Sequence, residues 1–247
     1  MNAYVAEFFG VVLLVVMGNG VVANVLLRQT KGEGGGWLLI TAGWGFAVYA
    51  AVLCVGEISG GHINPAVTIG LAAAGKFAWP QVAGFVAAQL AGGVVGGAVV
   101  YFFYKDHYEV TESAELKLAT FCNAPAIRNP PRNLACELIA TFVLVFAVLS
   151  ISDPALQAEG GETPIGLGSI GAVRVGLIVF AIGMSLGGTT GYAINPARDL
   201  GPRIAHALLP IGGKGTSDWE YAAIPVVGPI LGGLLAALVF AFTSATS

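Results

Sequence analysis

Two stretches of this sequence carry the same Asn-Pro-Ala triplet: Gly60-Gly61-His62-Ile63-Asn64-Pro65-Ala66 and Gly191-Tyr192-Ala193-Ile194-Asn195-Pro196-Ala197-Arg198-Asp199. The two asparagines lie 131 residues apart in a chain of 247. Asparagine is a strong helix N-cap and proline is favoured at the first helical position, so each triplet predicts the start of a helix. Each helix follows a long apolar run and is itself too short to cross a membrane. Two half-length helices, one in each half of a membrane chain, indicate a pore or a binding site near the midplane.

The composition is that of a membrane protein. Hydrophobic residues make up 56% of the chain and charged residues only 10%, whereas a soluble domain has about 25% charged residues. This balance excludes an ordinary cytosolic protein and a nucleic-acid-binding protein, and the net charge of −3 points to no charged partner. The three cysteines lack metal-ligand spacing, and no catalytic triad or phosphate-binding glycine loop is present, so we expect no enzyme, no metal and no cofactor.

Six segments are long and apolar enough to span a membrane as helices. They cover about 4–27, 37–57, 80–103, 133–152, 168–187 and 221–243. The half-length helices are predicted from Asn64 to about Ala74 and from Asn195 to about Leu209, each reaching about halfway through a 30 Å hydrocarbon core. The sequence therefore predicts an all-α membrane protein with six transmembrane helices and two half-helices, in a single domain over residues 1–247.

The two halves of the chain repeat each other. Ala6-Glu7-Phe8 recurs as Cys136-Glu137-Leu138, and the two glutamates precede their Asn-Pro-Ala triplets by 57 and 58 residues. Each half holds three full spans, an odd number, so the second half must enter the membrane in the opposite direction. We therefore expect inverted repeats over about 1–104 and 133–247, joined by a polar surface loop over 105–132.

At these triplets and glutamates the chain resembles the aquaporin superfamily, the major intrinsic proteins, over nearly its whole length. Within that superfamily it is most similar to the aquaglyceroporins, especially bacterial glycerol facilitators. Asp199 after the second triplet, Arg203 four residues later and Pro225-Val226 at the start of the last span are typical of that group. The resemblance implies a passive channel for glycerol and water that excludes ions and protons and forms homotetramers.

The orientation in the bilayer follows from the resemblance and not from the charges. It implies a multi-pass protein of the plasma membrane with cytoplasmic termini. A count of Lys and Arg in the connections would instead place both termini outside. We expect the orientation that the resemblance implies, because the charge rule reports a bias and these connections are not all short.

The two asparagines are expected at the midplane. Each side-chain oxygen would accept N–H groups of its own helix, which leaves the NH2 group free to point into the lumen as a donor. The positive ends of two helix dipoles would meet there, repelling cations and interrupting a proton wire. The chain before each cap is expected to run extended, with carbonyls facing the lumen, through Gly60, Gly61 and His62 and through Thr190, Gly191 and Tyr192. His62 would either line the lumen or hold its loop in place.

Arg198 is the most informative charge. A charge within a spanning region is expensive and normally faces a cavity or a partner. The resemblance implies that Arg198 belongs to a selectivity filter with Trp44, Gly183 and Tyr192. The two aromatic residues would face a carbon backbone, and Gly183 would leave room. Bacterial glycerol facilitators usually carry Phe at the position of Tyr192, so the solute range of this chain is open.

Glu7 and Glu137 are carboxylates within spanning segments. They are expected to accept hydrogen bonds from N–H groups of the irregular loops before the half-helices, which would otherwise be unsatisfied. A proton relay is the alternative. Gln89 is expected to serve the same loops. Asp199 lies just inside its helix, where a negative charge is favoured by the dipole, and would help to hold its loop.

Three other functions fit parts of the sequence. A water-selective channel is disfavoured by Gly183, Asp199 and Pro225. A channel for another small neutral solute, such as urea, dihydroxyacetone or undissociated lactic acid, stays open because of Tyr192. A secondary active transporter also uses inverted repeats and broken helices, but it would need a coupling-ion site, for which only Glu7 and Glu137 are candidates.

Overall fold

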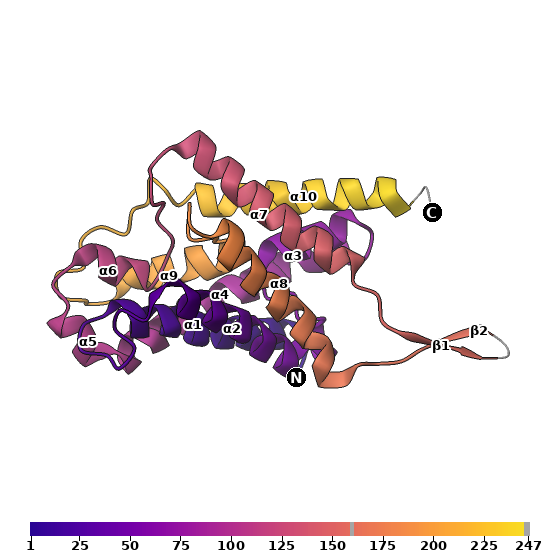
Figure 1. The fold of residues 1–247 in the computed structure, drawn as a ribbon, viewed down its shortest axis with the longest axis horizontal. Helices are drawn as coiled ribbons and strands as arrows, with labels where there is room; N and C mark the ends of the chain where they lie inside the picture. Colours follow the sequence, from indigo (N-terminus) through magenta and orange to yellow (C-terminus); the bar gives the residue numbers. More distant parts are fainter. Residues whose placement is uncertain (159–160, 245–247) are drawn as a thin grey trace.

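Long helices lie side by side along one direction in the computed structural model, which describes residues 1–158 and 161–244 (Figure 1). The N-terminus and the described end of the last helix (Ile224–Ser244) lie toward the same end of this bundle (Figure 1). The elements along the chain are α1 (Ala3–Leu26), α2 (Gly36–Ser59), α3 (Pro65–Ala73), α4 (Trp79–Phe103), α5 (Lys105–Val110), α6 (Ala114–Ala119), α7 (Pro130–Ser150), β1 (Ala155–Ala158), β2 (Gly161–Pro164), the 3-10 turn η1 (Gly168–Ile170), α8 (Gly171–Leu186), α9 (Pro196–Leu208) and α10 (Ile224–Ser244).

The predicted fold class is confirmed, with shifted boundaries. Among the described helices, α1, α2, α4, α7 and α10 are long and apolar enough to span a membrane, and α8 is a shorter apolar helix of 16 residues. The start of the fifth span was predicted too early, because Gly168 has a left-handed φ of 52° that an α-helix does not allow. The helix α7 begins at Pro130, earlier than predicted, because the side chain of Asn129 caps it.

The two halves pack with the same pattern of helix contacts and exchange their half-helices. In the first half α1 packs on α2 and α4, and in the second half α7 packs on α8 and α10. The half-helix α3, however, packs on α10 of the second half, and α9 packs on α4 of the first half. Each half therefore completes the interior of the other.

Paired glycines allow this exchange. A Cβ atom at Gly93 of α4 would lie 2.4 Å from the carbonyl oxygen of Ala197, at the start of α9. A Cβ at Gly233 of α10 would lie 2.6 Å from the carbonyl oxygen of Ala66, at the start of α3. Small residues let membrane helices approach this closely, so these glycines hold the half-helices against their partner helices.

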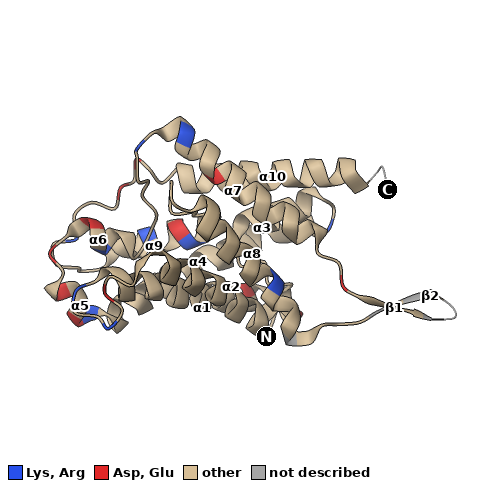
Figure 2. Ribbon diagram, in the orientation of Figure 1, with Lys and Arg blue, Asp and Glu red and all other residues tan. Residues whose placement is uncertain are grey.

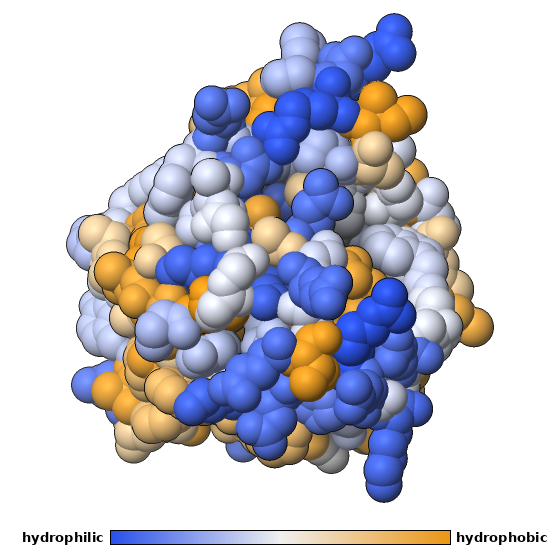
Figure 3. Space-filling view, turned by 90° about the vertical axis from the view of Figure 1, so that its left-hand side faces the viewer, coloured by the Kyte–Doolittle hydropathy of each residue, from blue (hydrophilic) through white to orange (hydrophobic). Residues whose placement is uncertain are grey.

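The surface of the bundle separates by polarity. Charged side chains gather at the end that carries α5 and α6 and are sparse along the long helices (Figure 2). Seen from that end, much of the surface is hydrophilic (Figure 3). Large apolar side chains are exposed along the helices, among them Phe46 at 66% and Leu177 at 60%. This distribution suits a protein surrounded by lipid along its length and by water at its ends.

The segment between the repeats is more than the surface loop predicted over 105–132. It contains α5 and α6, and its next part turns into the protein, where Asn123 is only 7% exposed. The Nδ2 of Asn19 on α1 donates to the carbonyl oxygen of Phe121 at 2.9 Å. This buried contact ties the connection to the bundle.

A hairpin of β1 and β2 follows α7 and was not predicted. Its strands are antiparallel, with Ala155 paired with Pro164, and it projects from the end of the bundle where the termini lie (Figure 1). Arg174 of α8 holds its base, donating from Nη2 to Asp153 Oδ1 at 2.8 Å and from Nη1 to the carbonyl of Ser152 at 3.0 Å. Strands this short give a weak signal in the sequence.

The exchanged packing can be tested with glycine substitutions. We expect Gly93→Ala to destabilise the protein by about 1–3 kcal/mol, because its methyl group meets a backbone carbonyl that cannot move aside. Gly20→Ala on α1 is the matched control, since a Cβ at this buried glycine has no other atom within 4 Å. Thermal unfolding of the purified proteins in detergent measures the difference. Equal midpoints for the two variants would contradict the packing described above.

Candidate functional site

The two half-helices begin at Asn64 and Asn195, each followed by a proline in the first turn. The side-chain oxygen of Asn64 accepts the N–H of Ala66 at 2.9 Å, and that of Asn195 accepts the N–H of Ala197 at 3.0 Å. Both asparagines have extended backbone conformations, as N-caps do. The local sequence thus starts both helices by the same mechanism.

The same two asparagines bind across the interface of the repeats. Asn64 Nδ2 donates to the carbonyl oxygen of Ile194, and Asn195 Nδ2 donates to that of Ile63, both at 2.8 Å. The expectation that the NH2 groups are free donors is therefore wrong for one hydrogen of each group. An amide nitrogen carries two hydrogens, so one on each side chain is left for the cavity that both asparagines line.

Glu7 organises the loop before the first half-helix. Its Oε1 accepts Ser59 Oγ at 2.6 Å and the backbone N–H of His62 at 3.0 Å. Its Oε2 accepts the N–H of Ile63 at 2.6 Å and Gln89 Nε2 at 2.7 Å. The carboxylate is fully buried and is used as an acceptor for the loop.

Glu137 makes the same arrangement in the second repeat. Its Oε1 accepts Thr190 Oγ1 at 2.6 Å and the N–H of Ala193 at 3.0 Å, and its Oε2 accepts the N–H of Ile194 at 2.9 Å. These contacts favour the scaffold hypothesis for both glutamates over a proton relay. Gln89 supports the first loop indirectly, because its Nε2 donates to Glu7 Oε2 at 2.7 Å and to Thr68 Oγ1 at 2.9 Å.

The loops themselves do not run extended as predicted. Six residues before the caps have a left-handed φ: Gly60 (85°), Gly61 (62°), Ile63 (44°), Gly191 (78°), Tyr192 (41°) and Ile194 (45°). For a β-branched isoleucine this conformation is strained and persists only where neighbouring contacts fix it. The N–H groups of both isoleucines bind a glutamate, and their carbonyls accept from the opposite asparagine.

A cavity of about 110 Å³ runs beside these loops. Its apolar lining comes from both repeats: Leu14, Val48, Val52, Val67, Leu71, Leu144, Val148, Val175 and Val179. The two loops, with His62, Asn64, Asn195 and Arg198, supply its polar lining. A cavity lined by both apolar and polar groups suits a solute that carries both kinds of group.

Arg198 is the charged residue among those that line this cavity. Its guanidinium carbon is 4.1 Å from the centroid of the Trp44 ring, which is a cation–π contact. Its Nη1 donates to the side-chain oxygen of Asn123. The first repeat has Val67 at the matching position, three residues after Asn64. The fixed charge is therefore present on only one side of the midplane.

Gly183 lies behind Tyr192 and not on the cavity wall. A Cβ at Gly183 would be 2.9 Å from the hydroxyl oxygen of Tyr192, so the glycine leaves room for the phenol. Trp37 holds this arrangement, donating from Nε1 to the carbonyl of Gly183 at 3.0 Å and meeting the Tyr192 ring edge-on. The buried hydroxyl of Tyr192 has no hydrogen-bond partner in the described chain. Of the four expected filter residues, Trp44, Tyr192 and Arg198 line the cavity.

His62 fills both roles considered for it. It lines the cavity, and its Nδ1 lies 3.2 Å from Thr68 Oγ1. Its ring packs against Phe77 and Phe85, with centroids 4.7 and 5.1 Å away. Over residues 1–158 and 161–244, no three His, Cys, Asp or Glu side chains are grouped closely enough to hold a metal ion.

Asp199 joins α9 to the segment between the repeats. Its Oδ1 accepts Arg203 Nη2 at 2.8 Å in a fully buried ion pair, and its Oδ2 accepts the backbone N–H of Asn123 at 2.7 Å. Burial raises the pKa of the neighbouring Cys122 thiol, which stays protonated. Asn123 was missed by sequence reasoning, because no local motif marks a residue whose partners are more than 60 positions away.

Comparisons with known proteins agree with this geometry. A family model described as major intrinsic protein matches residues 1–240. The "Probable glycerol uptake facilitator protein" of Thermotoga maritima is 50% identical over 97% of this chain and 98% of its own length. The "Glycerol uptake facilitator protein" of Streptococcus pneumoniae is 49% identical over the same shares. The X-ray structure of the aquaglyceroporin from Plasmodium falciparum is similar with a TM-score of 0.81 and 30% identity, over 96% of this chain and 94% of that one.

The role of the buried glutamates can be tested by removing one charge. We expect Glu137→Gln to lower the stability of the protein and its flux, because an amide NH2 would face N–H or O–H donors, at a cost of about 1–3 kcal/mol for each donor left unpaired. Glu57→Gln, on the exposed face of α2, is the matched control. Thermal unfolding and proteoliposome flux of both variants would show the difference. A Glu137→Gln protein as stable as the control would refute the scaffold role.

Proposed function

Because this chain belongs to the major intrinsic protein family, we propose that it is a membrane channel through which glycerol and water cross passively. The observation that carries the proposal is the lining of the cavity, which combines apolar side chains with the two loops and their polar side chains. Glycerol has hydroxyl groups along one edge and a carbon backbone along the other, so both edges find matching surroundings. The names of the relatives support glycerol as the solute.

The polar lining would replace the water that a solute leaves behind. Arg198 offers guanidinium donors at the neck, and Asn64 and Asn195 each offer one amide hydrogen at the midplane. Carbonyl groups of the loops are the acceptors. Glu7 and Glu137 are both engaged by their loops, which disfavours a coupling-ion site and hence a secondary active transporter.

Ions and protons would be excluded by positive potential in the same region. The N-terminal ends of α3 and α9 point toward each other at the midplane, and Arg198 adds a full charge.

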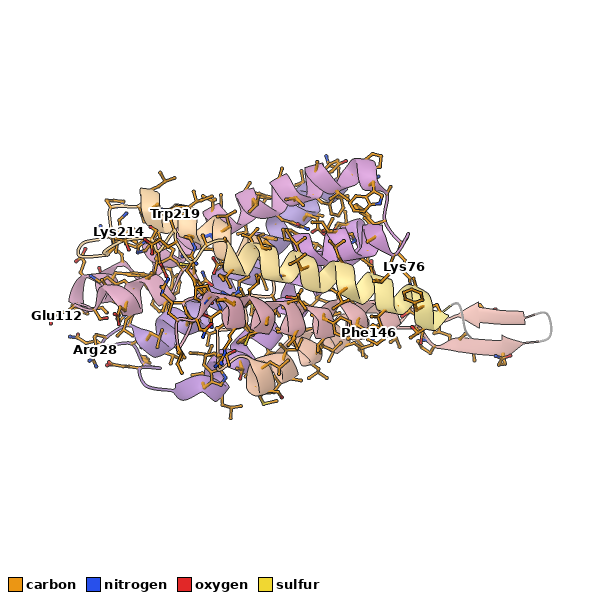
Figure 4. All side chains as sticks on the ribbon, turned by 90° about the horizontal axis from the view of Figure 1, so that it is seen from above. Arg28, Lys76, Glu112, Phe146, Lys214 and Trp219 are labelled. Atoms are coloured by element: carbon orange, nitrogen blue, oxygen red, sulfur yellow. The ribbon has the colours of Figure 1, made fainter. Side chains whose placement is uncertain are left out.

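Lys214 neutralises the opposite, negative end of α9, where its Nζ donates at 2.6–2.8 Å to the carbonyls of His206, Ala207 and Leu209. Lys214 lies at the same end of the molecule as Arg28 and Glu112, away from Lys76 (Figure 4).

The setting proposed for this channel is the plasma membrane, as a homotetramer with cytoplasmic termini. An even number of spans puts both termini on one side, in agreement with their position in Figure 1. Apolar side chains exposed on α2 and α8, such as Phe46 and Leu177, offer surface for lipid or for a neighbouring copy. Glycine-rich helices are common at such contacts.

Stopped-flow light scattering on proteoliposomes tests the proposed solute. We expect vesicles that contain the protein to shrink when glycerol is added outside and then to re-swell faster than protein-free vesicles, as glycerol enters down its gradient. Shrinkage in an impermeant sugar measures water separately. Fast shrinkage without re-swelling would show a water-selective channel, and faster entry of urea or lactic acid than of glycerol would assign another neutral solute.

The packing of Gly183 against Tyr192 gives a second test. We expect Gly183→Ala to push the phenol into the neck and to reduce glycerol permeability roughly tenfold more than water permeability, the discrimination that one misplaced methylene can give. Gly188→Ala is the control, because a Cβ at Gly188 meets nothing within 4 Å. Tyr192→Phe should keep glycerol flux, since it removes only an unpaired hydroxyl. Equal losses of glycerol and water flux in Gly183→Ala would argue against this geometry.

A further inference from the structure

The side chain of Asn123 contacts Arg198, which lines the cavity, although Asn123 belongs to neither repeat. Its oxygen accepts Nη1 of Arg198, and its Nδ2 donates to the carbonyl oxygen of Thr190 at 3.1 Å. The planar carboxamide of Asn123 thus binds both the guanidinium of Arg198 and a carbonyl of the second loop. Asn123 is 7% exposed, so both contacts are shielded from water.

The backbone around Asn123 is fixed independently of these two contacts. Its N–H donates to Asp199 Oδ2 at 2.7 Å, and its carbonyl accepts Arg203 Nη2 at 3.1 Å. Two residues earlier, the carbonyl of Phe121 accepts from Asn19 of α1. The carboxamide therefore projects from a backbone that is anchored to both α1 and α9.

Gly191 packs closely against the side-chain amide of Asn123. A Cβ at this glycine would lie 2.5 Å from Asn123 Nδ2, and its φ of 78° is itself left-handed. Glycine is needed here both for the turn and for the approach of the amide. The pore loop and the connecting segment are thus fitted to each other at this position.

Arg198 has few other restraints. Its guanidinium stacks on Trp44 and, within the described residues, its side chain donates one hydrogen bond, to Asn123. A guanidinium has five N–H donors in a fixed plane, so holding one of them orients the rest. Where those donors point is then set by Asn123.

We propose that Asn123 is a positioning residue of the channel: it fixes the guanidinium of Arg198 and the carbonyl of Thr190 relative to each other and thereby sets the preference for glycerol over water. The inference rests on the proposed function. A carboxamide is suited to this task because it presents an acceptor and a donor in one plane. Aspartate would keep the acceptor for Arg198 and lose the donor for Thr190, and leucine of similar size would lose both.

The test compares glycerol and osmotic water permeability in proteoliposomes for Asn123→Leu, Asn123→Asp and the unchanged protein. Asn133→Leu is the matched control. Asn133 is also buried and also binds backbone of this segment, at Ile127 and Asn129, but it does not touch Arg198. Asn123→Leu is measured again in an Arg198→Val background, since an effect that acts through Arg198 must vanish there.

We expect Asn123→Leu to lower the glycerol-to-water ratio by about threefold or more, the size of a typical coupling between contacting residues. Water is small enough to pass a loosened neck, whereas glycerol needs a donor at a fixed place. Asn123→Asp should lower the ratio less, Asn133→Leu should leave it unchanged, and Asn123→Leu should add nothing to Arg198→Val.

An unchanged ratio in Asn123→Leu, the same fall in Asn133→Leu, or a fall that persists in the Arg198→Val background would overturn the inference. Should Asn123→Leu fail to fold, as judged by gel filtration, Asn123→Asp decides alone, and a ratio equal to that of the unchanged protein overturns the inference. Failure of the unchanged protein to conduct glycerol would instead refute the proposed function.

Discussion

Backbone that is not helical cannot lie in the middle of a membrane unless the protein itself satisfies its polar groups. The two loops before the half-helices meet this constraint with buried acceptors from outside the loops. Glu7 and Glu137 each accept two backbone N–H groups and one hydroxyl of the loop they serve. The carbonyls of Ile63 and Ile194 are in turn bound by the asparagine of the opposite half. Without these contacts, neither half-helix could start at the midplane.

The same contacts explain why the chain is duplicated. The cap of each half-helix completes the loop of the other half, and each half-helix packs on a long helix of the other half through a glycine. A single repeat would leave one carbonyl and one helix face unsatisfied at membrane depth. In the proposed channel, selectivity would then come from departures from the symmetry. These are Arg198 against Val67, Tyr192 against Gly61, and Asn123, which lies outside both repeats.

The sequence predicts those parts of the structure that depend on local signals. Asn-Pro at two places marked both half-helices, and the spacing of Glu7 and Glu137 identified their common role. The left-handed conformation of Ile63 was not predictable, because contacts distant in sequence enforce it against the preference of the residue. The position of Asn123 escaped for a similar reason. Its partners come from α9 and the second loop, so only the folded chain brings them together.

The strain in the loops and the function proposed for them are connected. Ile63 and Ile194 hold φ values of 44° and 45° because a glutamate and an asparagine fix each of them on both sides. Strained backbone of this kind is found where a site must keep one geometry. A solute that leaves water must find donors and acceptors already in place, since any reorganisation would add to the barrier. In the proposed channel, the buried carboxylates would therefore act on permeation without touching the solute, by keeping the two loops rigid.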